Sequence, residues 1–120
     1  MKRFVYLIFL TIFLLTLLSG CSSSESSTII GIYLESKNGT HMIIGESIGP
    51  IVMSNKSKND TLFDALQTGD KIKITCTPVA ESYPGQCGVY KLKLIAQGSI
   101  EDINKETLDK LKEMGWIDNY

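Results

Sequence analysis

Two segments in the second half of the chain alternate apolar and polar residues, which is the pattern of a β-strand with one buried face. The apolar positions of KIKITC (71–76) are Ile72, Ile74 and Cys76. The apolar positions that share one face of CGVYKLKLI (87–95) are Tyr90, Leu92 and Leu94. Lysine or threonine fills most of the opposite face, so the two segments predict a hairpin with one face on a core and one in water.

Residues 28–54 predict three more strands, because this part of the chain is rich in β-branched and aromatic residues. These are TIIGIYLES (28–36), THMIIGE (40–46) and GPIVMS (49–54). Asn38-Gly39 between the first two is a strong hairpin signal, since both residues tolerate positive φ. Pro50 has no N–H to donate, so it belongs at the start of a strand or on an edge.

Two segments have helical spacing. In TLFDALQTGD (61–70), Leu62, Phe63 and Leu66 predict about one helical turn that ends at Gly69. The second segment is a C-terminal helix at about 103–114. It has Asn104 as N-cap, Ile103 and Leu108 placed for a hydrophobic staple, Gly115 as the stop and Trp116 placed to fold back on Leu111.

Five strands, a short helical turn and one C-terminal helix predict a mainly β fold. The simplest such architecture is a small, five-stranded, OB-like barrel that is partly open. A fragment of a β-sandwich, or a split sheet with one packed helix, fits the same elements. The folded part spans 28–120 and is short enough to be a single domain.

The N-terminus has the pattern of a secretory signal. Lys2 and Arg3 precede an apolar run (4–18), and Leu18-Ser19-Gly20-Cys21 matches the bacterial lipoprotein signal. By that resemblance, residues 1–20 are a signal peptide and Cys21 carries a lipid; the alternative is an ordinary signal peptide in which Cys21 is incidental. The serine-rich segment 21–27 is a flexible tether. We therefore expect a lipid-anchored protein on the outer face of the cytoplasmic membrane.

Charge and composition narrow the range of partners. Removing Lys2 and Arg3 leaves ten lysines against 13 acidic residues, a net charge of −3. Nucleic acid is therefore not an expected partner, since a basic surface carries most of that affinity. His41 is the only histidine, and the cysteines lack zinc spacing, so we expect neither a metal nor a cofactor.

Cys76 and Cys87 remain once Cys21 is lipidated, and an even pair outside the cytoplasm is a candidate disulfide. The alternation argues against it, because Cys76 lies on the apolar face and Cys87 shares its parity with Lys91 and Lys93. A bulge at Gly88 would bring the two thiols to the same face. The pairing is open at this point.

The segment GESIG (45–49) matches the G-x-S-x-G pattern, with Ser47 in the position of a nucleophile. That motif needs a helix after the serine, whereas Pro50, Ile51 and Val52 predict a strand, so we interpret the segment as a turn. The acidic residues fit a solvated surface: Asp60, Asp64, Asp70, Glu101 and Asp102. We therefore predict no catalytic residue and no enzymatic activity.

The loop AESYPGQCG (80–88) joins the two alternating strands. Tyr83-Pro84-Gly85-Gln86 fits a type II turn, with Pro84 fixing φ and Gly85 supplying positive φ. A cis Tyr83–Pro84 bond is the alternative. Turn chemistry does not explain why Glu81, Tyr83 and Gln86 gather here, and these side chains suit a contact surface.

The segments TGDKIKI (68–74) and VAESYPGQ (79–86) resemble a family of small secreted lipoproteins of Bacillus and related bacteria. That family carries a G-(D/Q)-K-(I/V)-K-(I/V) strand before an E-S-Y-P-(A/G)-Q loop. The resemblance implies an OB-like barrel without an established activity. Its signature positions here are Glu81, Ser82, Tyr83, Pro84 and Gln86. Cys76, Cys87 and the helical tail from 101 depart from the pattern.

Together these features predict a non-enzymatic binding module of the cell envelope. Its partner would be an envelope protein, a wall component or a small molecule, bound by the 80–88 loop. An enzyme or enzyme inhibitor that acts on wall polymers is the alternative. A passive envelope protein with no single partner is a third.

Overall fold

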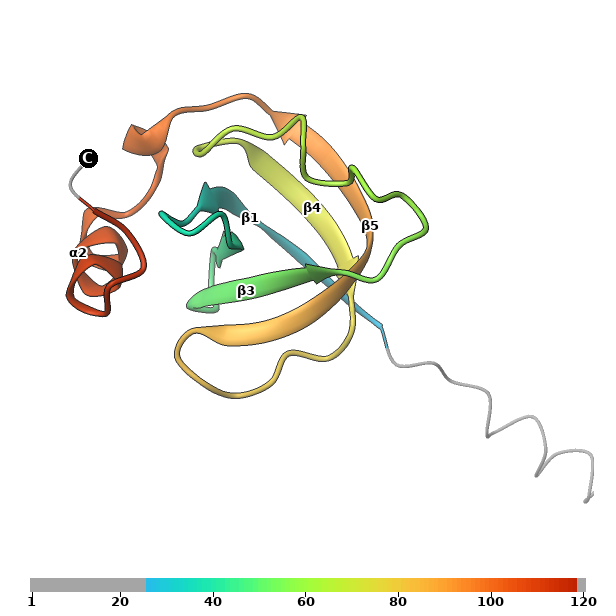
Figure 1. The fold of residues 1–120 in the computed structure, drawn as a ribbon, viewed down its shortest axis with the longest axis horizontal. Coiled ribbons are helices and arrows are strands. Elements are labelled where there is room, and N and C mark those ends of the chain that lie inside the picture. Colours follow the sequence, from blue (N-terminus) through green and yellow to red (C-terminus); the bar gives the residue numbers. More distant parts are fainter. Residues whose placement is uncertain (1–25, 119–120) are drawn as a thin grey trace, which may run out of the picture.

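The computed structural model describes residues 26–118, and their strands form a closed barrel (Figure 1). The strands are β1 (Ser27–Glu35), β2 (His41–Gly45), β3 (Pro50–Asn55), β4 (Lys71–Cys76) and β5 (Gly85–Ala96). The order around the ring is β1-β2-β3-β5-β4, with β3 and β5 parallel and the other pairs antiparallel. The predicted five-stranded barrel is confirmed, and its ring is closed rather than partly open.

The predicted signal peptide (1–20), the lipidation site Cys21 and most of the tether lie outside the described residues. Ser27, which we assigned to the tether, is the first residue of β1. Among residues 26–118, no helix is long and apolar enough to cross a membrane.

The Asn38-Gly39 hairpin forms between β1 and β2, but with a different turn from the one predicted. Only Gly39 has positive φ, at 80°, and Asn38 does not. The N–H of Gly39 donates to the carbonyl of Ser36 at 3.0 Å, and the N–H of Ser36 donates to the carbonyl of Thr40 at 2.9 Å. This is a three-residue hairpin loop that ends in a left-handed glycine.

The segment 61–66 forms turns rather than a regular helical turn. The N–H groups of Asp64 and Leu66 donate to the carbonyls of Thr61 and Phe63, each three residues back. Phe63 is buried and Leu66 packs beside it against the barrel interior. The one short helical element of the described residues is instead a 3-10 helix at Ile100–Asp102.

The C-terminal helix α2 (Lys105–Glu113) has the predicted caps. Asn104 Oδ1 accepts from the N–H of Glu106 at 2.8 Å. At the other end Gly115 has a φ of 82°, and the N–H of Trp116 donates to the carbonyl of Leu111 at 2.9 Å. This is the Schellman arrangement, which brings Trp116 back onto the helix as expected.

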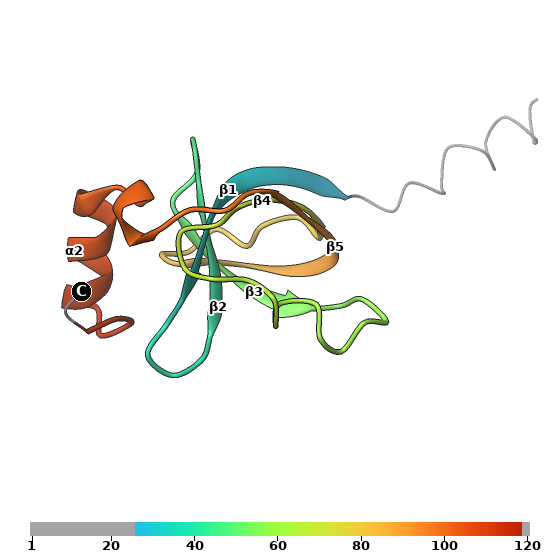
Figure 2. The same cartoon turned by 90° about the horizontal axis from the view of Figure 1, so that it is seen from above.

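Residues 26–118 form two separate hydrophobic clusters. One fills the barrel, and its residues come from all five strands and from Phe63. The other lies outside the barrel, where α2 covers one face of β1 and β2 (Figure 2). Its buried members are Leu34, Met42, Ile44, Ile103, Leu111 and Ile117. Two clusters form because β1 and β2 have apolar residues both on the face toward the barrel interior and on the face toward α2.

The inward face of β5 differs from the prediction. Thr75 pairs with Lys91 and Cys76 pairs with Val89, so Tyr90 has no partner in β4 and forms a bulge. Cys87 and Val89 therefore point into the core, while Tyr90 is 47% exposed. The prediction that Tyr90 shares a buried face with Leu92 and Leu94 is wrong, because the bulge shifts the alternation by one residue.

Candidate functional site

The bulge at Tyr90 brings the two remaining cysteines together. Cys76 and Cys87 are both buried in the same hydrophobic cluster of the barrel core, close enough that each changes the pKa of the other. Burial, and secondarily the neighbouring Cys76, raises the pKa of the Cys87 thiol to about 12. The parity objection is thereby removed, although the bulge lies at Tyr90 rather than Gly88. Both thiols are free in this structure, and the disulfide stays a prediction.

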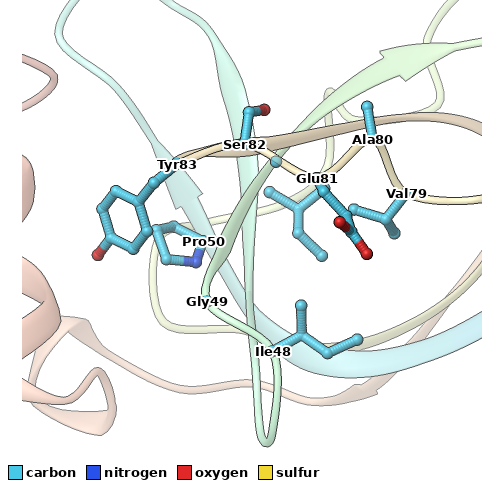
Figure 3. A pocket seen from close by; sticks show the side chains of 10 residues that line it. Ile48, Gly49, Pro50, Val79, Ala80, Glu81, Ser82 and Tyr83 are labelled. Carbon is cyan, nitrogen blue, oxygen red and sulfur yellow. The ribbon is translucent and has the colours of Figure 1, made fainter.

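A pocket of about 410 Å³ lies between the β2–β3 loop and the β4–β5 loop (Figure 3). Its walls are residues 48–51 on one side and residues 79–83 with Gly85 on the other. Most of these residues are apolar. The pocket therefore joins the loop that the sequence singled out with a segment about 30 residues earlier in the chain.

The β4–β5 loop is not the predicted type II turn. The Tyr83–Pro84 bond is cis, and Gly85 does not have positive φ. Gly85 is already part of β5, where it pairs with Ile51, so its backbone is extended. The hydroxyl of Ser82 donates to the carbonyl of Pro84 at 2.7 Å and braces the turn.

The predicted contact residues divide into two groups. Glu81, Ser82 and Tyr83 line the pocket, whereas Pro84 and Gln86 do not. Figure 3 shows the Glu81 side chain on the side where Ile48 and Pro50 lie, and the Ser82 side chain pointing the other way. Glu81 is therefore the charged side chain of a pocket that is lined mostly by apolar residues.

Tyr83 is held between the β2–β3 loop and α2. A Cβ atom added to Gly49 would lie 3.3 Å from Cε2 of Tyr83, so the ring lies close over that glycine. The ammonium of Lys110, on α2, is 6.0 Å from the centre of the ring. The ring is still 46% exposed and can contact a ligand. Sequence reasoning missed the contacts of Tyr83 with Gly49 and Lys110, because both residues are distant from the 80–88 loop in the sequence.

Ser47 and His41 are not brought together. Ser47 is exposed in the loop between β2 and β3, and a strand follows it, which confirms the turn interpretation. The Nδ1 atom of His41 instead contacts the hydroxyl of Tyr33 at 2.5 Å. The imidazole ring stacks on the ring of Phe63, with 4.4 Å between the ring centres. Burial, with a smaller effect of nearby carboxylates, raises the pKa of Tyr33 above its ordinary value.

Asp70 is buried rather than solvated, contrary to the prediction, with 3% of its surface exposed. Its carboxylate accepts from the N–H of Gln67 at 2.9 Å and from the N–H of Gly98 at 3.2 Å. Asp70 therefore joins two connecting segments and has a structural role. Within residues 26–118, no cluster of three or more histidine, cysteine or acidic residues could hold a metal ion.

The outer face of β2 is covered. OB-like barrels often bind oligonucleotides or oligosaccharides on the face of their second and third strands. Here Met42 and Ile44 of β2 are buried under α2, and Val52 of β3 packs against the same cluster. No residue of α2 lines the pocket between the β2–β3 and β4–β5 loops, so the helix leaves this pocket accessible.

Comparison with known proteins adds one structural neighbour. No family model matches the chain, and no curated protein matches it. A crystal structure of a yobA protein from Bacillus subtilis subsp. subtilis str. 168 is similar, with 16% sequence identity and a TM-score of 0.48. The match covers 62% of this chain and 99% of that one.

Proposed function

We propose that the protein is a lipid-anchored binding module of the cell envelope, whose pocket takes an aliphatic group that ends in a cation. The pocket between residues 48–51 and 79–85 is the observation that carries this proposal. The lipoprotein signal before Cys21 and the serine-rich tether support the location. The tether would hold the barrel close to the membrane and let it turn toward a partner.

The chemistry of the pocket supports this ligand class. Its volume of about 410 Å³ falls in the range of small-ligand sites, about 300–1,000 Å³. Ile48, Pro50 and Val79 offer apolar surface, and burying apolar surface contributes about 25 cal/mol per Å². Glu81 adds one negative charge, so a cation at the end of the aliphatic group is favoured over an anion.

Titration of the mature chain with two matched probes tests the ligand class. The probes are n-hexylammonium and n-hexanoate, which share an alkyl chain and differ in charge. We expect n-hexylammonium to shift the backbone amide NMR signals of Gly49, Ala80 and Gly85 more strongly. Glu81→Gln should weaken this binding by about threefold, as for a solvent-exposed ion pair.

The matched control is Glu101→Gln, which removes one exposed acid outside the pocket. It should leave binding of n-hexylammonium unchanged. Equal binding of both probes, or an equal effect of the two variants, would contradict the proposed role of Glu81. Release of sugar or peptide fragments from added wall polymer would instead favour the alternative, an enzyme.

Labelling of growing cells with radioactive palmitate tests the anchor separately. We expect label in the natural protein and none in the Cys21→Ser variant, because the serine cannot form the thioether. A Cys76→Ser variant is the control, since that thiol lies in the barrel core and the variant keeps Cys21. Equal labelling of the natural protein and Cys21→Ser would refute lipid anchoring.

A further inference from the structure

The second half of β5 is paired on one side only. β3 pairs with β5 from Gly85 to Val89, and the last backbone bond on that side runs from the N–H of Lys56 to the carbonyl of Val89 at 2.9 Å. From Tyr90 to Ala96 the strand continues beside β4. Figure 1 shows this bend, with β5 first beside β3 and then beside β4. Within the described part of the chain, no strand pairs with the other edge of Tyr90–Ala96.

Large apolar side chains gather on this half-paired strand. Three of the seven exposed large hydrophobic residues of the described chain lie here: Tyr90, Leu94 and Ile95, each more than 40% exposed. An exposed strand edge with apolar side chains is a template for another strand. The remaining exposed hydrophobic residues are scattered over other elements.

Lysines line the outer face of the same strand. Lys93 lies directly opposite Lys73 of β4, and Lys91 lies opposite Thr75. These three lysines surround a shallow groove of about 290 Å³. The ion pairs between lysines and acids in residues 26–118 involve Lys37 and Lys71, and none of these three. Like charges directly opposite each other cost stability, which an anionic partner would recover.

We propose that the free edge of Tyr90–Ala96 accepts an extended acidic segment of a partner protein as an added strand. Strand addition supplies main-chain hydrogen bonds, and alternate side chains supply specificity. Acidic residues of the segment would meet Lys91 and Lys93 on the outer face, and its apolar residues would lie beside Leu92 and Leu94. A second copy of this chain is disfavoured, because its own lysines would lie against these.

This inference goes beyond the proposed function, because it needs neither the pocket nor Glu81. Fluorescence anisotropy with the full mature chain tests it, using three labelled seven-residue peptides. One alternates glutamate and valine, the second alternates lysine and valine, and the third repeats the first with N-methyl groups on alternate backbone nitrogens. The N-methylated peptide keeps its charge but cannot pair along one edge.

We expect only the unmodified acidic peptide to bind. The double variant Lys91→Glu, Lys93→Glu should weaken its binding by about tenfold or more, since repulsion replaces attraction. The matched control Lys58→Glu, Lys105→Glu makes the same change in charge at exposed positions outside β5 and should change binding by about twofold at most. Circular dichroism confirms that each variant is folded.

Four results would overturn the proposal. Equal binding of the N-methylated peptide, or full competition by inorganic polyphosphate, would show that the lysines attract any anion and that no strand is added. An equal loss of binding in both double variants would show that net charge alone decides. If no peptide binds, the lysines only protect the edge from association.

Discussion

The two halves of β5 belong to one strand, yet they have opposite environments. Residues Gly85–Val89 lie beside β3, and Cys87, Gly88 and Val89 are buried. From Tyr90 on, the strand has β4 on one side only, and no residue as far as Ala96 is fully buried. Burial therefore follows the number of neighbouring strands. The bulge at Tyr90 marks the change from one environment to the other.

The bulge also explains how one strand can serve two purposes. Before it, Cys87 and Val89 complete the barrel core; after it, Leu92 packs against the core while Lys91 and Lys93 face solvent. If Tyr90 paired regularly instead of bulging, the inward positions before it would continue in phase as Lys91 and Lys93. The bulge allows a buried half and an exposed half with opposite parity in one strand.

Val89→Lys is the strongest way to break this comparison. It places a charge at a fully buried, inward position of the first half of β5. We expect loss of the folded state, or a decrease in the free energy of unfolding of more than about 4 kcal/mol, because an unpaired buried charge is costly. Thermal and urea unfolding followed by circular dichroism measure it.

Tyr90→Lys is the control. It introduces the same side chain one position further along, where the natural side chain is 47% exposed. Its effect on unfolding should stay below about 1 kcal/mol. A Val89→Lys variant as stable as the natural protein would show that β5 shifts its register freely.

Truncations on either side of the bulge give the next largest difference. Val89→Ala leaves a cavity in the core and should lower the free energy of unfolding by about 2 kcal/mol. Leu94→Ala removes more atoms, but 41% of Leu94 is exposed, and we expect a loss of about 0.5 kcal/mol. Urea unfolding of the reduced protein gives both values. A larger loss for Leu94→Ala would mean that the second half is covered.

Local signals in the sequence were sufficient for several elements. The alternation of 71–76 predicted β4 with its bounds, and Asn104 and Gly115 predicted both caps of α2, because these features depend on residues a few positions apart. Ring closure and the parallel pairing of β3 with β5 depend on residues more than 30 positions apart. The bulge at Tyr90 exists only in the pairing of β5 with β4, so alternation within β5 alone could not reveal it.

The candidate site was predictable in part, for the same reason. The unusual composition of the 80–88 loop singled out Glu81, Ser82 and Tyr83, which line the pocket. The opposite wall, residues 48–51, and Lys110 reach the loop only through the closure of the barrel and the packing of α2. The cis Tyr83–Pro84 bond was the alternative to the type II turn, and local turn chemistry did not favour it.

High pH should lower the free energy of unfolding through a thiol in the buried half of β5. Burial raises the pKa of Cys87 from an ordinary value of 9.0 to about 12. Between these values the unfolded chain loses the thiol proton and the folded chain keeps it. Stability is therefore complete below pH 9 and falls as the pH rises, by up to about 1.4 kcal/mol per pH unit for this thiol. Urea unfolding of the reduced protein from pH 8 to pH 10 measures the slope.

Cys87→Ala removes this titrating group and should make the slope shallower, while the buried Cys76 keeps part of it, since burial raises its pKa too. An unchanged slope in Cys87→Ala would show that Cys87 ionises normally in the folded state. If the untreated protein has a mass about two daltons lower than the reduced one, the disulfide has formed, and the pH dependence should then appear only after reduction.

The smallest expected effect concerns the exposed half, where Lys73 and Lys93 face each other across β4 and β5. Lys73→Gln removes one of two like charges and should raise the free energy of unfolding by about 0.3 kcal/mol at low salt. The gain should disappear in about 1 M salt, where charges are screened within about 3 Å. Lys58→Gln, in the exposed loop after β3, should change stability less at either salt concentration. A loss of stability in Lys73→Gln would mean that the lysine stem covers apolar surface; a salt-sensitive gain would mean that the barrel keeps this repulsion at a cost, as expected of a surface that meets an anionic partner.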